Sequence, residues 1–289
     1  MFTHLIKRAA TVMEALPYLI KFSGKTIVIK YGGAAMENPE LKNAVMRDVV
    51  LLKYAGMNPI IVHGGGPEIN RFLKRRNIET EFVHGLRVTT KEVMEVVEHV
   101  LGNRINAEIV SLIKKNGGKA KGFFGKKGRV IKARKHLAKN KKGEPIDIGF
   151  TGDVAGIRYR FLQKWMKIGY IPVLSPIGVG NKGQSYNINA DQAAEAVAVH
   201  LKAAKLILMT NVRGVLDKDG ELVSSVNSDK ADRMIKLGHI SGGMIPKIKS
   251  SLDAIKNGVE KVHIIDGRIP HAILLEIFTD HGIGTMVEE

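Results

Sequence analysis

Short β-branched runs alternate along this chain with helical stretches, and this alternation narrows the folds open to it. Strands are predicted at residues 26–29, 59–62, 170–174, 205–210 and 260–265. Helices are predicted at residues 41–54, 91–115, 158–168, 190–201 and 245–257, and from the turn at Pro67 through residue 76. Strands alternating with helices indicate a mostly parallel sheet covered on both faces. A basic, glycine-rich stretch at residues 118–130 is predicted to form a hairpin.

Composition excludes several classes of protein. The 289 residues are 44% apolar and 25% charged, which is typical of one large globular domain or two ordinary ones. No apolar run approaches the roughly 18 residues of a membrane span. The absence of cysteine excludes disulfide scaffolds, thiolate zinc sites and cysteine nucleophiles, and the ten histidines show no metal-ligand spacing. His4, Lys7, Arg8 and Glu14 interrupt any signal-peptide core, so we expect a cytoplasmic protein.

The net charge of +17 is unevenly distributed. Residues 1–180 contain 32 basic and 14 acidic side chains, whereas residues 181–289 contain 13 and 14. The charge balance changes near the glycine-rich stretch 178–184, where we expect a boundary between two halves, 24–180 and 181–289. Eleven basic residues and no acid lie between Lys119 and Lys142. This run is either a nucleic-acid contact or a solvated lysine-rich loop or hairpin, and the scarcity of aromatic platforms favours the second.

The first residues predict an amphipathic helix ahead of the alternating region. Its apolar stripe has spacings of three and four, and Pro17 ends or kinks it. The stripe packs either on its own domain or on another subunit. Its members are Phe2, Leu5, Ile6, Ala9, Val12, Met13 and Leu16.

Glycine-rich turns follow the first two predicted strands. Lys30-Tyr31-Gly32-Gly33 follows one, and Gly64-Gly65-Gly66 follows the next. Glycine lets backbone approach a ligand closely, and N–H groups at a helix start attract anions. Two such turns at neighbouring carboxyl ends indicate an anion-binding crevice. The chain has no Walker A loop, and the G-x-G-x-x-G match at residues 178–183 does not open a helix.

Polar side chains near these turns permit two interpretations. Asn189 and Asp191 are either a helix cap and a dipole-stabilising acid or, with Asn187, a polar cluster that lines a site. Lys30 ends an apolar strand, where a charge is unusual unless it faces a cleft, and Lys247 lies near a helix start. Each lysine alone is a surface lysine by default.

Arg87 lies in the segment Gly85-Leu86-Arg87-Val88-Thr89. It either clamps a carboxylate with two parallel hydrogen bonds or forms a surface ion pair.

Five motifs in order resemble the amino-acid kinase family, from about residue 24 to the end. They are the segments beginning at Lys30, His63, Gly85, Asn187 and Gly242. The segment around Arg87 is similar to members that phosphorylate N-acetyl-L-glutamate in arginine biosynthesis. The resemblance implies a three-layer αβα sandwich around a mainly parallel sheet of about eight strands. It also implies that residues 24–180 bind acetylglutamate and residues 181–289 bind ATP.

The implied reaction transfers the γ-phosphoryl group of ATP to the side-chain carboxylate, giving N-acetyl-L-glutamyl 5-phosphate and ADP. Such chemistry depends on positioning and charge neutralisation. The family pattern assigns Lys30 and Lys247 to the transferring group and Asp191 to their orientation. Mg²⁺ is expected to be held mainly by the phosphates. The pattern assigns Gly65, Gly66, Arg87, Asn187 and Asn189 to the acetylglutamate site, and Gly32, Gly33, Asn211, Val212, Arg213, Gly214, Val215, Leu216, His239, Ile240 and Ser241 to the ATP site.

The added N-terminal segment, residues 1–23, resembles that of arginine-inhibited members, which join dimers into hexamers through this helix. In that subgroup the positions that bind arginine match Tyr18, Lys205, His263, Glu276 and Gly282. The basic run at 119–142 departs from the family pattern, and the residues do not reveal whether a PII-type signalling protein binds. The alternatives are a sister kinase for another carboxylate, such as an aminoadipate derivative, and a non-catalytic arginine sensor or nucleic-acid-binding protein. We expect neither a membrane nor a nucleic acid as partner.

Overall fold

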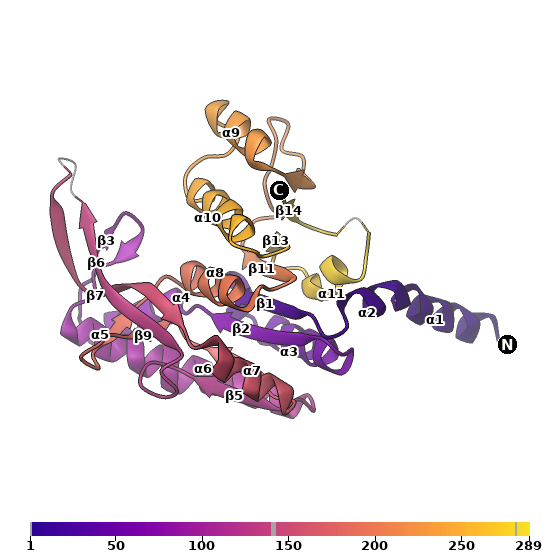
Figure 1. The fold of residues 1–289 in the computed structure, drawn as a ribbon, viewed down its shortest axis with the longest axis horizontal. Coiled ribbons are helices and arrows are strands. Elements are labelled where there is room, and N and C mark those ends of the chain that lie inside the picture. Colours follow the sequence, from indigo (N-terminus) through magenta and orange to yellow (C-terminus); the bar gives the residue numbers. More distant parts are fainter. Residues whose placement is uncertain (1, 140–142, 281) are drawn as a thin grey trace.

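A computed structural model describes residues 2–139, 143–280 and 282–289 as three layers, with helices on both faces of one large sheet (Figure 1). The strand order in this sheet is β12-β14-β13-β11-β1-β2-β8-β5. Every neighbouring pair is parallel except β13–β14. The prediction of an αβα sandwich with a mainly parallel sheet of eight strands is therefore confirmed.

The strands of the large sheet are β1 (Thr26–Tyr31), β2 (Asn58–His63), β5 (Ala120–Phe123), β8 (Ile171–Leu174), β11 (Lys205–Thr210), β12 (Ser225–Val226), β13 (Lys261–Asp266) and β14 (Thr285–Val287). The helices are α1 (Thr3–Glu14), α2 (Leu16–Phe22), η1 (Gly33–Met36), α3 (Pro39–Tyr54), α4 (Gly66–Arg75), α5 (Lys91–Val97), η2 (Glu98–Ile105), α6 (Asn106–Lys115), α7 (Tyr159–Lys167), α8 (Ala190–Leu201), α9 (Ser228–Lys236), α10 (Met244–Lys256) and α11 (Ala272–Ile277). Four further strands, β6 (Ile131–Lys139), β7 (Pro145–Ile157), β9 (Ile177–Val179) and β10 (Ser185–Asn187), close on one another, and β3 (Phe82–Val83) pairs with β4 (Leu86–Arg87).

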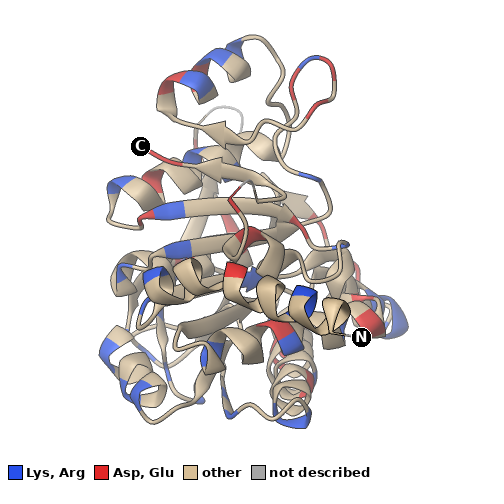
Figure 2. Cartoon of the chain, turned by 90° about the vertical axis from the view of Figure 1, so that its right-hand side faces the viewer, with Lys and Arg blue, Asp and Glu red and all other residues tan. Residues whose placement is uncertain are grey.

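Alternate residues of the central strands supply two separate cores. On β1, Ile27 and Ile29 pack with α3, α6 and α11, whereas Val28 packs with α7, α8 and α10. Because side chains on a strand alternate between faces, apolar residues at every position bury both faces at once. Figure 2 shows that Lys and Arg lie mostly on the helices and loops around the sheet.

The prediction of a hairpin at residues 118–130 is wrong. Residues 120–123 form β5, which pairs in parallel with β8 at the edge of the large sheet. The small residues that suggested a turn instead permit close packing: a Cβ on Gly122 would lie 1.9 Å from Asn106 Oδ1. The long hairpin is β6–β7, which projects from the body (Figure 1). In β6, buried Ile131 and Ala133 alternate with exposed lysines and arginines, while Asn140, Lys141 and Lys142 of the basic run lie outside the described residues.

The glycine-rich stretch at residues 178–184 connects β9 to β10 and opens no helix. This agrees with the rejection of a dinucleotide fingerprint there. The division into halves at this stretch stays a prediction.

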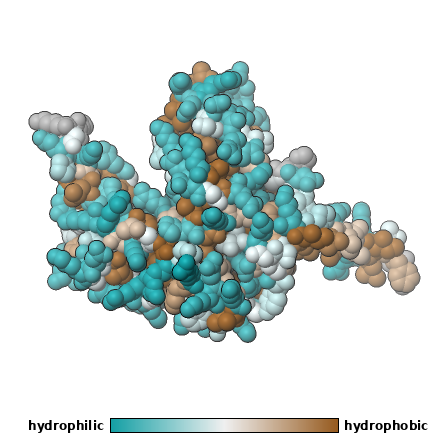
Figure 3. Space-filling view, in the orientation of Figure 1, coloured by the Kyte–Doolittle hydropathy of each residue, from teal (hydrophilic) through white to brown (hydrophobic). Residues whose placement is uncertain are grey.

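The N-terminal helices extend away from the body (Figure 1). The break falls at Ala15, and Pro17 lies in the first turn of α2, where a missing N–H costs no hydrogen bond. No residue of α1 is buried; the side chains of its stripe from Phe2 to Met13 include five that are 55–69% exposed, and the projecting helix is visibly apolar in Figure 3. Packing of α1 on its own domain, one of the two interpretations, is thus contradicted. No helix within the described ranges combines the length and apolarity needed to cross a membrane.

Candidate active site

Two lysines from distant parts of the chain meet on one carboxylate. Lys30 lies near the carboxyl end of β1, Asp191 in the first turn of α8, and Lys247 near the start of α10. Lys30 Nζ is 3.1 Å from Asp191 Oδ1, and Lys247 Nζ donates to Asp191 Oδ2 at 2.5 Å. The fold therefore brings together the three residues expected to act on the phosphoryl group.

The charges of this triad determine its protonation. Burial raises the pKa of Asp191, but the charges of Lys30 and Lys247 and their hydrogen bonds outweigh burial, and the net shift is downward. Asp191 is thus an anion at neutral pH. One negative charge between two ammonium groups leaves a net positive charge, which suits an anionic ligand.

Asn189 serves the same helix as its cap. Its side-chain oxygen accepts from Asp191 N at 2.8 Å and from Gln192 N at 3.3 Å. The two interpretations of this segment are therefore compatible, because the cap fixes the helix turn that carries Asp191.

Close packing requires glycine at a position in each of the two turns. Gly65 is the N-cap of α4, and a Cβ there would lie 2.4 Å from Leu101 Cδ2 and 2.6 Å from Ile105 Cδ1. Gly33 has φ +70°, and Asn211 Oδ1, which accepts from Ala34 N at 2.7 Å, occupies the space of its Cβ. Both turns therefore place backbone where no other residue fits.

A cavity of about 250 Å³ lies between these turns. It is lined by polar, glycine and apolar residues from β1, β3, β4, β7, β10, η2 and the starts of α4 and α8. The predicted residues in its wall are Lys30, Gly32, Gly33, Gly65, Gly66, Arg87, Asn187, Asn189 and Asp191. N–H groups at the start of α4 and the nearby ammonium group make this wall attractive to an anion.

Arg87 is a buried cation at this cavity. Its guanidinium donates to Asn70 Oδ1 at 2.5 Å and to Thr80 Oγ1 at 3.5 Å, and it lies 4.7 Å from the Phe82 ring centre. Asn70 and Thr80 are both neutral. No carboxylate among the described residues forms an ion pair with Arg87, so its charge is not balanced as it would be in a surface ion pair. Burial lowers the pKa of Arg87. A buried arginine without an anionic partner fits a ligand carboxylate.

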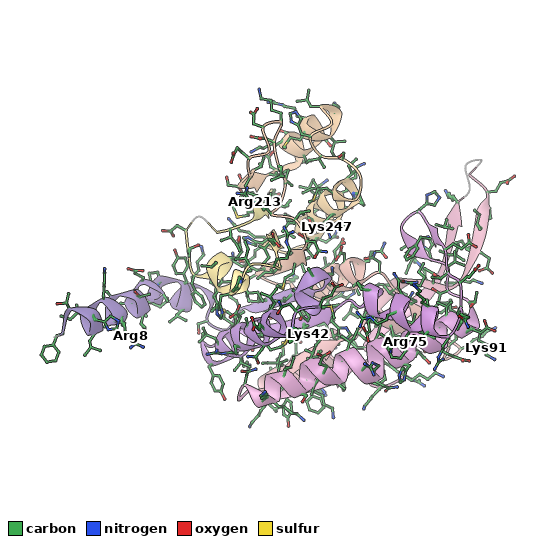
Figure 4. All side chains as sticks on the ribbon, turned by 180° about the vertical axis from the view of Figure 1, so that it is seen from behind. Arg8, Lys42, Arg75, Lys91, Arg213 and Lys247 are labelled. Atoms are coloured by element: carbon green, nitrogen blue, oxygen red, sulfur yellow. The ribbon has the colours of Figure 1, made fainter. Side chains whose placement is uncertain are left out.

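Only some of the residues expected to bind ATP lie at the cavity beside Lys30. Residues 211–216 form the loop after β11, where Asn211 contacts the β1 turn and Val215 N donates to Thr285 Oγ1 at 2.8 Å. His239, Ile240 and Ser241 precede α10. Figure 4 shows Arg213 and Lys247 in the same part of the molecule, apart from Arg75 and Lys91. Of this set, the cavity beside Lys30 includes Gly32 and Gly33 but none of residues 211–216 or 239–241.

Sequence reasoning assigned no role to three residues of the site. Thr151 lines the cavity, and Asn70 holds the Arg87 guanidinium. His63 is wholly buried directly before the glycine turn. Only His63 gave a readable signal, since a polar residue at the end of an apolar strand needs a structural reason.

A second cavity, of about 390 Å³, lies between α2, β13 and α11. All five residues matched to arginine binding line it: Tyr18, Lys205, His263, Glu276 and Gly282.

Lys205, His263 and Glu276 form a hydrogen-bonded row in this second cavity. Lys205 Nζ is 2.9 Å from His263 Nε2, and His263 Nδ1 is 2.5 Å from Glu276 Oε1. Burial lowers the pKa of Lys205 to about 8 and also lowers that of His263. For Glu276, burial raises the pKa, but His263, the N–H of Ile283 and Lys205 together lower it. The second cavity thus contains the Glu276 carboxylate, which is an anion, with hydrogen-bond donors close to it.

Comparisons with known proteins agree with this geometry. A profile of the amino acid kinase family matches residues 25–266. Proteins named acetylglutamate kinase from Caldicellulosiruptor saccharolyticus and Heliobacterium modesticaldum are each 54% identical to this chain, over 285 and 289 residues. These matches cover 98% of this chain and 97% and 98% of those proteins.

A solved structure shares the fold. It is N-acetylglutamate synthase from Neisseria gonorrhoeae complexed with coenzyme A and N-acetyl-glutamate, with a TM-score of 0.87 at 24% identity. The match covers 97% of this chain and 63% of that one, and at this identity it supports the fold alone. The family match across most of the sequence and the two close, full-length relatives establish that this chain belongs to the amino acid kinase family.

Proposed function

We propose that this chain transfers the γ-phosphoryl group of ATP to the side-chain carboxylate of N-acetyl-L-glutamate, in the second step of arginine biosynthesis. The observation that carries the proposal is the pair Lys30 and Lys247 on Asp191, beside a glycine-walled cavity that also holds Arg87. The close relatives named acetylglutamate kinase support the choice of substrate.

The reaction needs charge neutralisation more than proton transfer. The acceptor carboxylate is already ionised at pH 7, so no general base is required. A carboxylate oxygen attacks the γ-phosphorus, the bond from that phosphorus to the β,γ-bridging oxygen breaks, and ADP leaves with the electron pair. Lys30 and Lys247 reduce repulsion between the two anions, and the N–H groups of Gly65 and Gly66 stabilise the transferring oxygens.

Arg87 would hold the α-carboxylate of acetylglutamate, with Asn187 and Asn189 beside it. Support comes from the burial of the guanidinium among neutral partners at the cavity wall. Residues 211–216 and 239–241 would hold the nucleotide, so residues 24–180 would be the acetylglutamate half and residues 181–289 the ATP half.

Magnesium would arrive with ATP and be held mainly by the phosphates. Within the described residues, no group of three or more His, Cys, Asp or Glu side chains is arranged to hold a metal. Asp191 is already shared by two lysines. When bound, the ion would neutralise charge on the β- and γ-phosphates.

The second cavity would bind L-arginine as a feedback inhibitor. The Glu276 carboxylate suits a guanidinium, and donors around Gly282 suit a carboxylate. The exposed stripe of α1 would join dimers into a hexamer, a trimer of dimers, since an unpartnered apolar helix is a liability on a monomer. A cytoplasmic location stays a prediction, as does the reading of the basic run as a solvated surface.

The test of the main proposal is ADP release with acetylglutamate beside glutamate, aspartate and aminoadipate. We expect turnover to depend on acetylglutamate and to fall by orders of magnitude with the other acids. Faster turnover on aminoadipate, or none on any acid, would reject the proposal.

A further inference from the structure

His63 is a polar side chain in the core, at the last position of β2 and directly before the glycine turn. It is 0% exposed. Its Nδ1 lies 2.9 Å from the carbonyl oxygen of Gly64, and its Nε2 lies 3.2 Å from Asn106 Nδ2. Asn106 Nδ2 also donates to the carbonyl oxygen of Val173 at 3.0 Å. The imidazole therefore links the turn to Asn106 at the start of α6, and Asn106 in turn bonds to β8.

These contacts define which ring nitrogen carries the proton. An amide NH₂ group only donates, so Nε2 of His63 accepts from Asn106. The proton of a neutral ring then resides on Nδ1 and is donated to the carbonyl of Gly64. Burial lowers the pKa of His63 to about 4, so the ring is neutral at physiological pH.

The orientation of the Gly64 carbonyl fixes the next N–H group. In a trans peptide the C=O of one residue and the N–H of the following residue lie in one plane and point in opposite directions. His63 holds the Gly64 oxygen, and the N–H of Gly64 donates to Tyr31 O at 2.8 Å. The N–H of Gly65 must therefore point away from the imidazole. Gly64, Gly65 and Lys30 all line the same cavity.

Close packing around Gly65 and Asn106 leaves little room for either residue to move. Leu101 and Ile105 of the π-helical segment η2 cover Gly65, and Asn106 begins the next helix. Asn106 itself fits only because Gly122 lacks a Cβ. The turn is thus held by the hydrogen bond from His63 to the Gly64 carbonyl oxygen and by the methyl groups of Leu101 and Ile105, which pack on Gly65.

We propose that His63 is a positioning residue for phosphoryl transfer: its Nδ1–H, kept in that tautomer by Asn106, directs the N–H of Gly65 toward the transferring group. The inference rests on the proposed function, since it assumes that phosphoryl transfer occurs at this turn. His63 itself touches neither substrate.

Two substitutions at His63 separate positioning from packing. The side-chain nitrogen of Asn reaches the place of Nδ1, whereas the oxygen of Gln reaches the place of Nε2. His63→Asn thus keeps the bond to Gly64 and loses the one to Asn106, while His63→Gln does the reverse. Each variant loses one buried hydrogen bond, so a purely structural role predicts similar changes in both.

We expect His63→Gln to lower kcat about tenfold to a hundredfold, the range for a misplacement approaching 1 Å, with KM values for ATP and acetylglutamate within about threefold of wild type. His63→Asn should retain most of kcat despite a comparable loss in melting temperature. Equal kcat values in the two folded variants, or a change confined to KM, would overturn the proposal. An inactive wild-type enzyme would instead reject the proposed function.

A second measurement covers the case in which neither variant folds. Nitrogen-15 NMR of the wild-type imidazole reports which ring nitrogen is protonated. We expect a neutral ring with its proton on Nδ1 throughout pH 6–8. A proton on Nε2, or a charged ring, would contradict the proposed tautomer.

Discussion

Asp191 accepts a hydrogen bond from Lys247 at 2.5 Å, and this contact ties the first turn of α8 to the first turn of α10. Lys30 approaches the other carboxylate oxygen from β1. The carboxylate thus sets the spacing of two ammonium groups that come from opposite halves of the chain.

Removing either lysine should therefore abolish most catalysis. For Lys30→Ala and Lys247→Ala we expect kcat to fall roughly a hundred- to a thousandfold, the usual cost of one contact to developing charge. Steady-state ADP release measures this, with circular dichroism as a check on folding. Lys249→Ala is the matched control, because Lys249 lies on the exposed side of the same helix. A lysine variant with near-normal kcat would remove that lysine from the mechanism.

Arg87→Lys should chiefly raise KM for acetylglutamate. A planar fork that can hold a carboxylate with two parallel bonds becomes a point charge. The KM for ATP should hardly change, and Arg75→Lys on the exposed face of α4 should leave both constants unaltered. A fall in ATP affinity with acetylglutamate unaffected would mean that the two halves have been assigned in reverse.

Asp48 should make stability depend on pH. It is 1% exposed, its Oδ1 lies 2.6 Å from His271 Nδ1, and its Oδ2 has no hydrogen-bond partner within the described residues. Burial raises the pKa of Asp48 to about 6, although His271 and Arg47 oppose the shift.

Between about pH 4 and about pH 6 the folded state therefore holds a proton that the unfolded state has lost, and stability falls as pH rises through this window. The total effect is at most about 3 kcal/mol. Urea unfolding of Asp48→Asn across pH 4–7 should show a shallower decline than wild type, while Asp232→Asn on α9 should follow wild type. Parallel curves for all three proteins would exclude this titration.

Two truncations separate assembly from inhibition. Removing residues 1–14 deletes α1 but keeps Tyr18, which donates to Asp280 at the second cavity. We expect this variant to form dimers by light scattering, with weaker arginine inhibition and basal kcat largely intact. Removing residues 1–20 should weaken inhibition further, because Tyr18 is then lost. A hexamer that survives the first truncation would refute the role given to α1.

The buried strands were the most predictable part of the fold. Runs such as residues 206–209 are apolar at every position, and this pattern is typical of a short strand covered on both faces. The error at residues 118–130 has the opposite cause. Gly122 is a residue typical of turns, but in the structure its missing Cβ leaves room for Asn106, which begins the preceding helix α6. Local secondary-structure propensity does not reveal a tertiary contact of this kind.

The sequence named candidate site residues, but it did not reveal their geometry. Lys30 stood out as a charge at the end of an apolar strand, whereas Asp191 and Lys247 were assigned through the family resemblance. The separation of the three in sequence gave no distance between them. The burial of Arg87 among neutral partners depends on Asn70 and Thr80 from a neighbouring segment. The π-helical turn that presses Leu101 and Ile105 on Gly65 has no distinctive sequence pattern.

The adjacency of β1 and β11 limits how this protein can be divided. These strands lie side by side in parallel at the centre of the sheet, although one comes from residues 26–31 and the other from residues 205–210. Cleavage between residues 178 and 184 would leave each fragment with a long apolar strand edge exposed, and such edges pair with other chains. Separately expressed fragments should aggregate, whereas fragments produced together should reassemble through this pair of strands, which makes the chain suitable for split-protein complementation.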